Sequence, residues 1–319
     1  MWTMDTLEWL DIELTSFCNI HCKGCVREIS KKADLILNKE YLSLDTIRER
    51  FRKEEMPAIK IINFCGSVDE PTTHPQFHDI VEYFADWDAH INIATNGSTR
   101  TEKWWEKLAK LLEGTSHAVT WGIDGSNNLS EVYRAGSNFA KVERNFRAFN
   151  GAGGRSNWQF IVFEHNEHQL EEAKQRATEE GFRNFKTIIS HRKDTKGGVK
   201  AAKTEPIDQA VETPYVNCKY GNQKRIFINH MGNVIPCCHL NSKMMEYSVS
   251  GGHKDAFESL LEDNNYKETI NLANVSIKDA ISSNIWQGIQ NSWGGDTPMP
   301  RCMQVCKQMK RDVFIKEEL

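Results

Sequence analysis

The chain has 319 residues, with 40 lysines and arginines against 44 aspartates and glutamates and a formal net charge of −4. This length suffices for one large domain with a smaller one, and the mild charge gives no sign of a nucleic-acid groove or a polybasic membrane patch. The amino-terminus lacks the apolar run of a signal peptide, and no stretch reaches the roughly 18 consecutive apolar residues of a membrane span. Nine cysteines without an export signal therefore predict a cytoplasmic protein with metal or redox chemistry.

Strand-like and helix-like segments alternate along the first part of the chain. The strand-like segments are short and apolar, and the segments between them carry apolar residues at helical spacing. The expected strands are residues 7–14, 59–64, 90–95, 119–123, 158–163 and 185–189, and the expected helices are residues 43–51, 75–87, 101–112, 138–149 and 168–180. This succession predicts an α/β fold with a parallel sheet, either curled into a barrel or opened as a doubly wound sheet.

Composition changes after the sixth expected strand. Lysine, glycine and threonine become frequent there, which is typical of a linker. We therefore expect one domain at residues 1–193, a linker at 194–212 and a second domain at 213–319. In the second domain we expect a β-hairpin around residues 227–235, a helical insertion at 240–293 and a carboxy-terminal helix.

Three cysteines follow the first expected strand. Cys18, Cys22 and Cys25 have the spacing C-x3-C-x2-C, which allows one loop to present three thiolates to an iron–sulfur cube. Such clusters usually have four cysteine ligands, so three leave one iron open for a cofactor unless another cysteine completes the set. A zinc site more often uses paired C-x2-C motifs, with His21 as a possible further ligand, and a disulfide framework is unusual in a long chain without a secretion signal.

The cysteine triplet resembles the signature of the radical S-adenosylmethionine (SAM) enzymes. The resemblance implies a partial (β/α)6 barrel, with the chemistry at the carboxyl ends of the strands. It also implies that Cys18, Cys22 and Cys25 hold a [4Fe–4S] cluster whose open iron binds SAM.

The segments after the second and third expected strands resemble SAM-binding motifs of that family. The segment from Gly66 to Pro71 is similar to a Gly-Gly-Glu-Pro turn that holds the SAM ammonium, with Glu70 as the best match and Asp69 as the second. The double glycine of that turn is absent here, which departs from the family pattern. Asn96 and Ser98 are similar to the Thr-Asn-Gly strand end that contacts the SAM ribose in relatives, although Asn-Gly alone is only a turn signal.

Further matches follow the fourth and fifth strands. Arg134 corresponds to a family arginine that binds the SAM carboxylate, a task suited to a planar bidentate donor, and Asp124 lies just before it at the strand end. Relatives often place a serine on the fourth strand where this chain has Gly122, and an aromatic residue where it has Gly24. Gln159 on the fifth strand is expected to face the substrate or the adenine, or to be an ordinary polar residue at the barrel rim.

Five cysteines follow the expected linker, and their spacing is similar to that of SPASM and twitch domains, which hold auxiliary [4Fe–4S] clusters. A full SPASM domain has more cysteines, so a small α+β twitch-like domain with one cluster fits better. The resemblance assigns Cys218, Cys237, Cys302 and Cys306 as the ligands. Cys238 is an alternate ligand or a buried thiol, and zinc remains an alternative to iron–sulfur at these cysteines.

Together the motifs imply a radical SAM oxidoreductase with two [4Fe–4S] clusters. SAM cleavage at the first cluster gives a 5′-deoxyadenosyl radical that abstracts hydrogen from a peptide, a protein or a small molecule, with a peptide favoured. The auxiliary cluster accepts or relays an electron, and a flavodoxin or ferredoxin supplies the reducing electron. Two alternatives stay open: an epimerase in which Cys65 or Cys238 returns hydrogen, and a non-enzymatic metal- or cluster-binding protein, which has no use for Glu70 and Arg134.

Overall fold

The computed structural model describes residues 2–28, 40–189, 199–203, 216–250, 256–294, 298–306 and 313–318. The expected linker at 194–212 lies outside these residues except for 199–203. Within the described residues, no helix is both long enough and apolar enough to cross a membrane.

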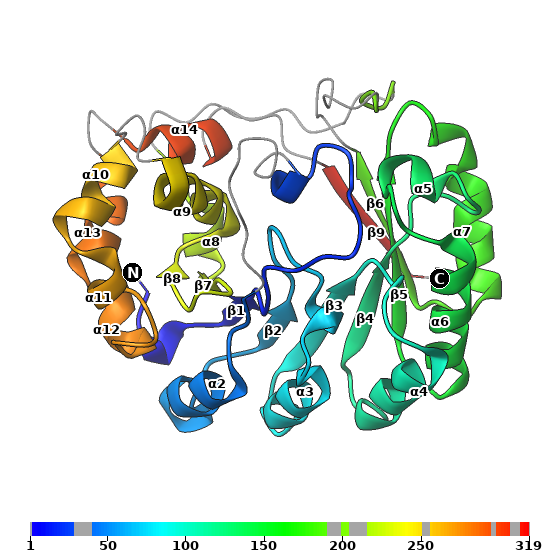
Figure 1. The fold of residues 1–319 in the computed structure, drawn as a ribbon, viewed down its shortest axis with the longest axis horizontal. Coiled ribbons are helices and arrows are strands. Elements are labelled where there is room, and N and C mark those ends of the chain that lie inside the picture. Colours follow the sequence, from blue (N-terminus) through cyan, green and yellow to red (C-terminus); the bar gives the residue numbers. More distant parts are fainter. Residues whose placement is uncertain are drawn as a thin grey trace.

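A nine-stranded sheet organises the molecule, in the order β8-β7-β1-β2-β3-β4-β5-β6-β9 (Figure 1). The first six strands are parallel, and each lies beside its neighbour in the sequence. This unreversed order is that of a barrel and not of a doubly wound sheet, so the predicted partial (β/α)6 barrel is confirmed. The six strands are β1 (Trp9–Ile12), β2 (Ile61–Phe64), β3 (His90–Thr95), β4 (Ala118–Gly122), β5 (Ser156–Val162) and β6 (Asn184–Ile189).

Helices connect these strands close to the predicted positions. Ser43 caps the first of them, because its Oγ accepts a hydrogen bond from the Thr46 N–H at 3.0 Å. The helix that precedes β6 ends just before Gly181, whose φ of 75° suits glycine. The α-helices are α2 (Leu44–Arg50), α3 (Phe77–Ala85), α4 (Glu102–Leu111), α5 (Ser130–Tyr133), α6 (Phe139–Gly151) and α7 (Leu170–Glu179), and the 3₁₀-helices are η1 (Met4–Thr6), η2 (Lys53–Glu55), η3 (Pro71–Thr73) and η4 (Glu167–Gln169).

Aromatic side chains fill the layer between the sheet and these helices. Trp121 of β4 lies 4.5 Å from Trp105 of α4, measured between ring centroids, and Trp158 of β5 lies 5.1 Å from Phe182. These tryptophans are fully buried. Because side chains alternate along a strand, the neighbours of Trp121 and Trp158 point to the opposite, inner face of the barrel.

The carboxy-terminal segment continues the same sheet. β7 (Arg225–Ile228) pairs in parallel with β1, and β8 (Val234–Ile235) pairs antiparallel with β7, which confirms the predicted hairpin. β9 (Val313–Glu318), a strand that the sequence did not predict, pairs antiparallel with β6 after the last helix. The helices of this segment are α8 (Lys219–Asn222), α9 (Cys238–Ser250), α10 (Ala256–Asp263), α11 (Tyr266–Thr269), α12 (Ile277–Ile281), α13 (Asn284–Ser292) and α14 (Pro300–Cys306).

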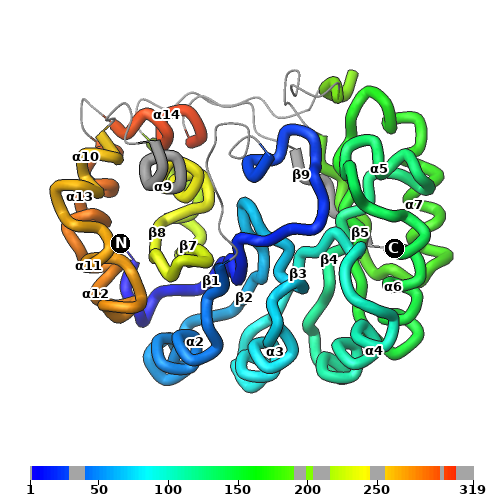
Figure 2. The backbone as a smooth tube through the Cα atoms, in the orientation of Figure 1, coloured from blue at the N-terminus to red at the C-terminus, as the bar shows by residue number. Residues whose placement is uncertain are grey.

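The two ends of the sheet are covered by different helices. α10–α14 gather beside β7 and β8, whereas α5–α7 lie at the end that holds β5 and β6 (Figure 2). The amino-terminus joins the first group, because the Trp2 ring lies 5.0 Å from Trp286 and 5.7 Å from Trp293. The loop that follows β1 lies between the two groups (Figure 2).

Candidate functional site

The loop with the three cysteines is hydrogen-bonded to the end of β3. Asn19 Nδ2 donates to Ser98 Oγ at 2.9 Å, and Asn96 Nδ2 donates to Asn19 Oδ1 at 3.0 Å. The same Asn96 amide nitrogen lies 3.7 Å from Cys18 Sγ, within reach of a weak hydrogen bond to sulfur. The structure therefore brings together three of the predicted site residues, Cys18, Asn96 and Ser98.

The loop is also tied to the segment that follows β4. His21 N donates to Ala135 O at 2.7 Å, and Lys23 N donates to Tyr133 O at 3.0 Å. These main-chain bonds flank Cys22. The loop thus lies across the carboxyl ends of β3 and β4, where parallel barrels carry their sites.

The three thiols of the loop are partly exposed. Burial and the negative charge of Glu70 raise the pKa of Cys18 to about 12. Burial likewise raises the pKa of Cys22 to about 12, although Arg134 opposes this shift. Since metal ligation requires thiolates, iron binding here must displace protons. Three thiols on one short loop beside a cation are a donor set that fits an iron–sulfur cluster.

Glu70 joins this loop to two strand ends. Its Oε1 accepts hydrogen bonds from Thr72 Oγ1 at 2.6 Å and Thr95 Oγ1 at 2.7 Å, and its Oε2 accepts from Asn96 N at 2.7 Å. Its own N–H donates to Phe17 O at 2.9 Å. Burial raises the pKa of this carboxyl, while these bonds favour its ionised form. Glu70 therefore fixes the turn that presents Asn96.

The turn after β2 is folded around Glu13, a residue that the sequence analysis missed. Glu13 Oε2 accepts hydrogen bonds from Ser67 N at 2.6 Å and Val68 N at 3.1 Å. A Cβ on Gly66 would lie 2.5 Å from the same oxygen, so this position needs glycine. The available signal was an acidic residue, Glu13, near the end of an apolar expected strand, but nothing local indicated its partners.

Asp69 lies between two other acids. Its Oδ2 accepts a hydrogen bond from Leu14 N at 3.2 Å. Burial, together with the charges of Glu13 and Glu70, raises the pKa of Asp69 well above its usual value. A neutral carboxyl at this position is a weaker partner for the SAM ammonium than an ionised one.

Arg134 and Asp124 form a buried ion pair at the end of β4. Arg134 Nε lies 2.8 Å from Asp124 Oδ2, and Asp124 Oδ1 accepts from Ile161 N at 2.8 Å. A Cβ on Gly122 would lie 2.5 Å from a terminal nitrogen of Arg134. The glycine on this strand therefore makes room for the guanidinium on the inner face, close to Cys22.

Gln159 lies on β5, beside the position of Gly122. It is level with Gly122 on β4 and with Lys186 on β6, on the inner face of the sheet. Its side chain is partly exposed. The structure thus places Gln159 on the inner wall, level with the glycine that makes room for Arg134.

A second group of cysteines lines one pocket beside β8. Cys218 precedes α8, Cys237 precedes α9, and Cys302 and Cys306 lie four residues apart on α14, and all four line this pocket. Residues four apart share one face of a helix. In the described parts of the chain, no three Cys, His, Asp or Glu side chains are placed as ligands of a single metal ion.

Two further cysteines lie toward the barrel interior. Cys238 does not line that pocket and instead lies 3.6 Å from the Tyr220 hydroxyl. Cys65 Sγ accepts a hydrogen bond from Asn63 Nδ2 at 2.6 Å. All nine cysteines are free thiols.

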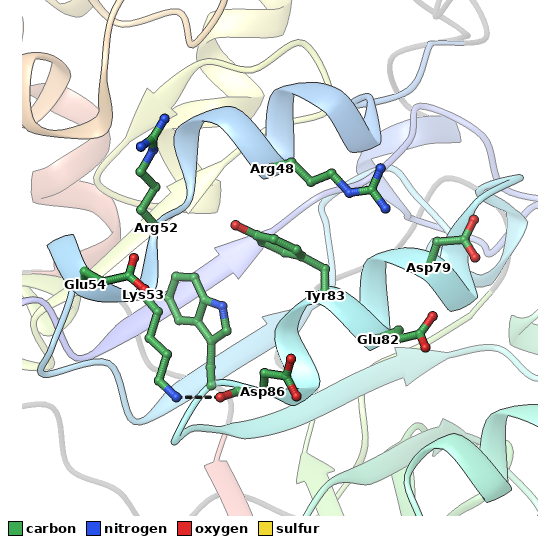
Figure 3. Close-up of a pocket in the computed structure, with 9 residues that line it drawn as sticks. Arg48, Arg52, Lys53, Glu54, Asp79, Glu82, Tyr83 and Asp86 are labelled. Carbon is green, nitrogen blue, oxygen red and sulfur yellow. Dashed lines mark hydrogen bonds between the residues drawn. The ribbon is translucent and has the colours of Figure 1, made fainter.

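A separate, charged groove lies between α2 and α3. The wall formed by α2 and η2 carries basic residues together with Glu54, whereas the wall formed by α3 and its carboxyl end carries acidic residues and Tyr83 (Figure 3). These two helices lie below the strands in Figure 1, whereas the loop after β1 lies above them. No predicted site residue lines the groove. Its labelled residues are Arg48, Arg52, Lys53, Glu54, Asp79, Glu82, Tyr83 and Asp86.

The fold and the cysteine loop define a parallel partial barrel with a thiol-rich site at the ends of its strands. Residues 12–177, more than half of the chain, match the family model of the radical SAM superfamily. The chain belongs to this superfamily, whose members are enzymes that use SAM with a [4Fe–4S] cluster.

Curated relatives match part of the chain. The tungsten-containing aldehyde ferredoxin oxidoreductase cofactor-modifying protein of Pyrococcus furiosus is 31% identical over 107 residues, which are 33% of this chain and 28% of that protein. The mycofactocin maturase MftC of Mycobacterium ulcerans is 25% identical over 162 residues, which are 50% of this chain and 41% of that protein. The chain thus spans less than half the length of these relatives.

Solved structures share the fold. The protein anSMEcpe with bound AdoMet superposes with a TM-score of 0.56 at 15% identity, covering 87% of this chain and 78% of that one. Streptococcus suis SuiB bound to S-adenosylmethionine gives a TM-score of 0.56 at 14% identity, covering 84% and 67%. At such identities the likeness concerns the fold alone.

Proposed function

We propose that this chain is a radical SAM oxidoreductase of the maturase type, with two [4Fe–4S] clusters and a twitch-like carboxy-terminal segment. When bound, the first cluster and SAM supply the 5′-deoxyadenosyl radical chemistry of the superfamily. The observation that carries the proposal beyond the superfamily is the pocket lined by four cysteines beside β8. A second cluster there accepts or relays an electron.

At the first site, Cys18, Cys22 and Cys25 hold the cluster. Arg134, oriented by Asp124, directs its remaining N–H groups at the SAM carboxylate. Asn96 and Ser98 lie against the cysteine loop and contact the SAM ribose, whereas Glu70 acts mainly by holding their turn in place. This assignment is supported by the hydrogen bonds that connect the loop to these strand ends.

At the second site, Cys218, Cys237, Cys302 and Cys306 are the ligands. Tetrahedral zinc with Zn–S bonds of about 2.3 Å holds its four sulfurs within roughly 4 Å of one another. A [4Fe–4S] cube is larger and separates its ligand sulfurs further. Four thiolates also suit a tetrahedral zinc site, so the metal analysis described below distinguishes the cluster from zinc.

A peptide is the favoured substrate, with a small molecule as the alternative. The relative MftC is named a maturase, SuiB has been solved with its precursor peptide SuiA, and anSMEcpe with a bound peptide. The reducing electron is expected from a flavodoxin or a ferredoxin in the cytoplasm.

Iron and sulfide analysis with electron paramagnetic resonance tests the proposal on protein reconstituted without oxygen. We expect about eight irons per chain, about four after the triple substitution Cys18→Ala/Cys22→Ala/Cys25→Ala, and about four after Cys302→Ala/Cys306→Ala. Added SAM should change only the electron paramagnetic resonance signal that the triple substitution removes. A wild-type content of about four irons, all lost in the triple variant, would refute the second cluster. Absence of 5′-deoxyadenosine from the loaded, reduced protein would favour a non-enzymatic role.

A further inference from the structure

The pocket beside β8 is lined by two nitrogen donors in addition to its four cysteines. Trp293 and Arg301 both line it, and the indole Nε1 of the first and the guanidinium Nε of the second are buried. Within the described residues, neither nitrogen forms a hydrogen bond of ordinary geometry. Since nearly all buried donors in folded proteins have an acceptor, two such donors in one pocket indicate that an acceptor binds there.

Neighbouring tryptophans show that the fold supplies acceptors to other indoles of this region. Trp2 Nε1 donates to Arg225 O at 2.9 Å, and Trp286 Nε1 donates to Val234 O at 3.1 Å. The Trp293 ring packs edge-on against Trp2, with the ring centroids 5.7 Å apart. The indole of Trp293 is therefore held by packing, like the other two, but its N–H group is left for the pocket.

Main-chain contacts place Trp293 beside the segments that carry two of the cysteines. Trp293 O, at the end of α13, accepts a hydrogen bond from Val216 N at 3.3 Å, two residues before Cys218. Burial raises the pKa of Cys302 to about 11, and the nearby indole N–H of Trp293 opposes this rise. The indole nitrogen therefore faces the sulfur of a predicted ligand.

Arg301 lies on α14 with its guanidinium divided between the surface and the pocket. Its Nη1 donates to Oε1 of the exposed Gln304, whereas its Nε is buried. Hydrogen bonds are stronger in apolar surroundings than in water. The remaining wall of this pocket includes three apolar residues, Pro236, Leu240 and Val305.

We propose that Trp293 and Arg301 donate these N–H groups to sulfur atoms of the auxiliary [4Fe–4S] cluster and thereby raise its reduction potential. The inference rests on the proposed function, in which the four cysteines of this pocket hold that cluster. Hydrogen bonds to the sulfurs are one of the factors that set such potentials. N–H donors stabilise the reduced form more than the oxidised form, because the reduced form carries one more negative charge. In the proposed reaction the substrate radical is oxidised by one electron, which reduces the cluster, and a higher potential favours this direction.

The midpoint potential of this cluster measures the effect without substrate turnover. The triple substitution Cys18→Ala/Cys22→Ala/Cys25→Ala removes the first cluster, so the remaining signal belongs to the second. The full-length variant is reconstituted without oxygen and titrated with dithionite and redox mediators, and the reduced form is followed by electron paramagnetic resonance. In this background, Trp293→Phe should lower the equilibrium constant for reduction about tenfold, which corresponds to a shift of 59 mV to lower potential for a one-electron couple.

Matched substitutions separate the donors from general effects of packing and charge. Trp286→Phe should leave the potential unchanged, because its N–H already has a main-chain acceptor in the same region. Arg301→Lys keeps the positive charge but removes the Nε–H, so it should also lower the potential. Arg144→Lys is its control, since Arg144 forms an exposed pair with Glu102.

Isotope labelling gives a second measurement that needs no change of potential. The triple variant is produced with tryptophan labelled with ¹⁵N in the indole ring, and the reduced cluster is studied by electron–nuclear double resonance. We expect a ¹⁵N coupling that disappears in Trp293→Phe and persists in Trp286→Phe. Absence of this coupling, an unchanged potential in Trp293→Phe, or an equal shift in Trp286→Phe would overturn the role of Trp293. An unchanged potential in Arg301→Lys would overturn that of Arg301.

Metal analysis of the same preparations keeps this result apart from the proposed function. About four irons in the triple variant, with no shift of potential and no ¹⁵N coupling, would refute the two donors alone and leave the second cluster in place. Zinc, or no iron, in the triple variant would refute the second cluster and with it the inference.

Discussion

Glu13 and His230 form a buried ion pair between the two parts of the chain. His230 Nδ1 lies 2.7 Å from Glu13 Oε1, and the two side chains are 2% and 0% exposed. Burial alone would raise the pKa of Glu13, but the hydrogen bond and charge of His230 hold it below its usual value. The same carboxylate binds the main chain of the turn after β2. This pair therefore couples the β7–β8 hairpin to the turn that carries Glu70.

Substituting Glu13→Gln should destabilise the protein strongly. The change keeps the size of the side chain but leaves His230 without its buried carboxylate partner, and breaking a buried pair costs roughly 3–5 kcal/mol. Urea unfolding measures the loss. Glu8→Gln is the matched control, because the Lys60–Glu8 pair is exposed and such pairs contribute about 0–1 kcal/mol. An equal loss in both variants would contradict the role of the buried pair.

Replacing Arg134 with lysine should weaken SAM binding about tenfold with little loss of folding stability. Lysine preserves the charge beside Asp124 but lacks the planar guanidinium group, which can donate hydrogen bonds to Asp124 and to the SAM carboxylate at once. Equilibrium dialysis with the reconstituted protein gives the affinity. Arg144→Lys serves as the control, since Arg144 forms an exposed pair with Glu102. Unchanged affinity in Arg134→Lys would remove this residue from the SAM site.

The variant Gly122→Ala should reproduce the effect of Arg134→Lys. Its Cβ would fall 2.5 Å from the guanidinium of Arg134 and force that group to move. Gly151→Ala is a suitable control, because a Cβ there meets nothing within 4 Å. The SAM dissociation constants of the two variants provide the comparison. If Gly122→Ala binds SAM with the wild-type dissociation constant, SAM binding does not depend on the position of the Arg134 guanidinium.

Cys238→Ser should leave the iron content unchanged, in contrast to Cys237→Ser. The two residues are adjacent, but only Cys237 lines the pocket with the other three predicted ligands, whereas Cys238 faces Tyr220. Iron analysis of both variants after identical reconstitution measures this difference. An iron loss in Cys238→Ser as large as in Cys237→Ser would make Cys238 a ligand. Retained iron with altered product would support the alternative in which this thiol returns hydrogen to the substrate.

Local sequence signals were sufficient to predict most helices and strands of the barrel. The cap at Ser43, the stop at Gly181 and the hairpin around Gly232 lie within a few residues of the elements they define, so the sequence shows them directly. The pairing of β7 with β1, the strand β9 and the Glu13–His230 pair depend on residues far apart in the chain. No periodicity or turn residue encodes such contacts, and tertiary packing decides them.

His74 should make folding stability fall in mildly acidic solution. Burial lowers its pKa to about 4 from the ordinary value of 6.5, and both ring nitrogens are used in the neutral form. Nε2 donates to Leu42 O, and Nδ1 accepts from the Gln76 N–H, both at 3.1 Å. As the pH falls, protons therefore bind His74 in the unfolded chain before they bind His74 in the folded protein. The contribution of His74 is complete above its unfolded pKa and declines as the pH falls from about 6.5 toward 4.

Comparing variants isolates this contribution from that of other titrating groups. In urea unfolding between pH 7 and pH 4, His74→Gln should be less stable than wild type at pH 7, and the difference should shrink toward pH 4. His168→Gln, at an exposed position, should keep the wild-type pH dependence. A difference between His74→Gln and wild type that stays constant over this range would show that His74 is not held neutral by the fold.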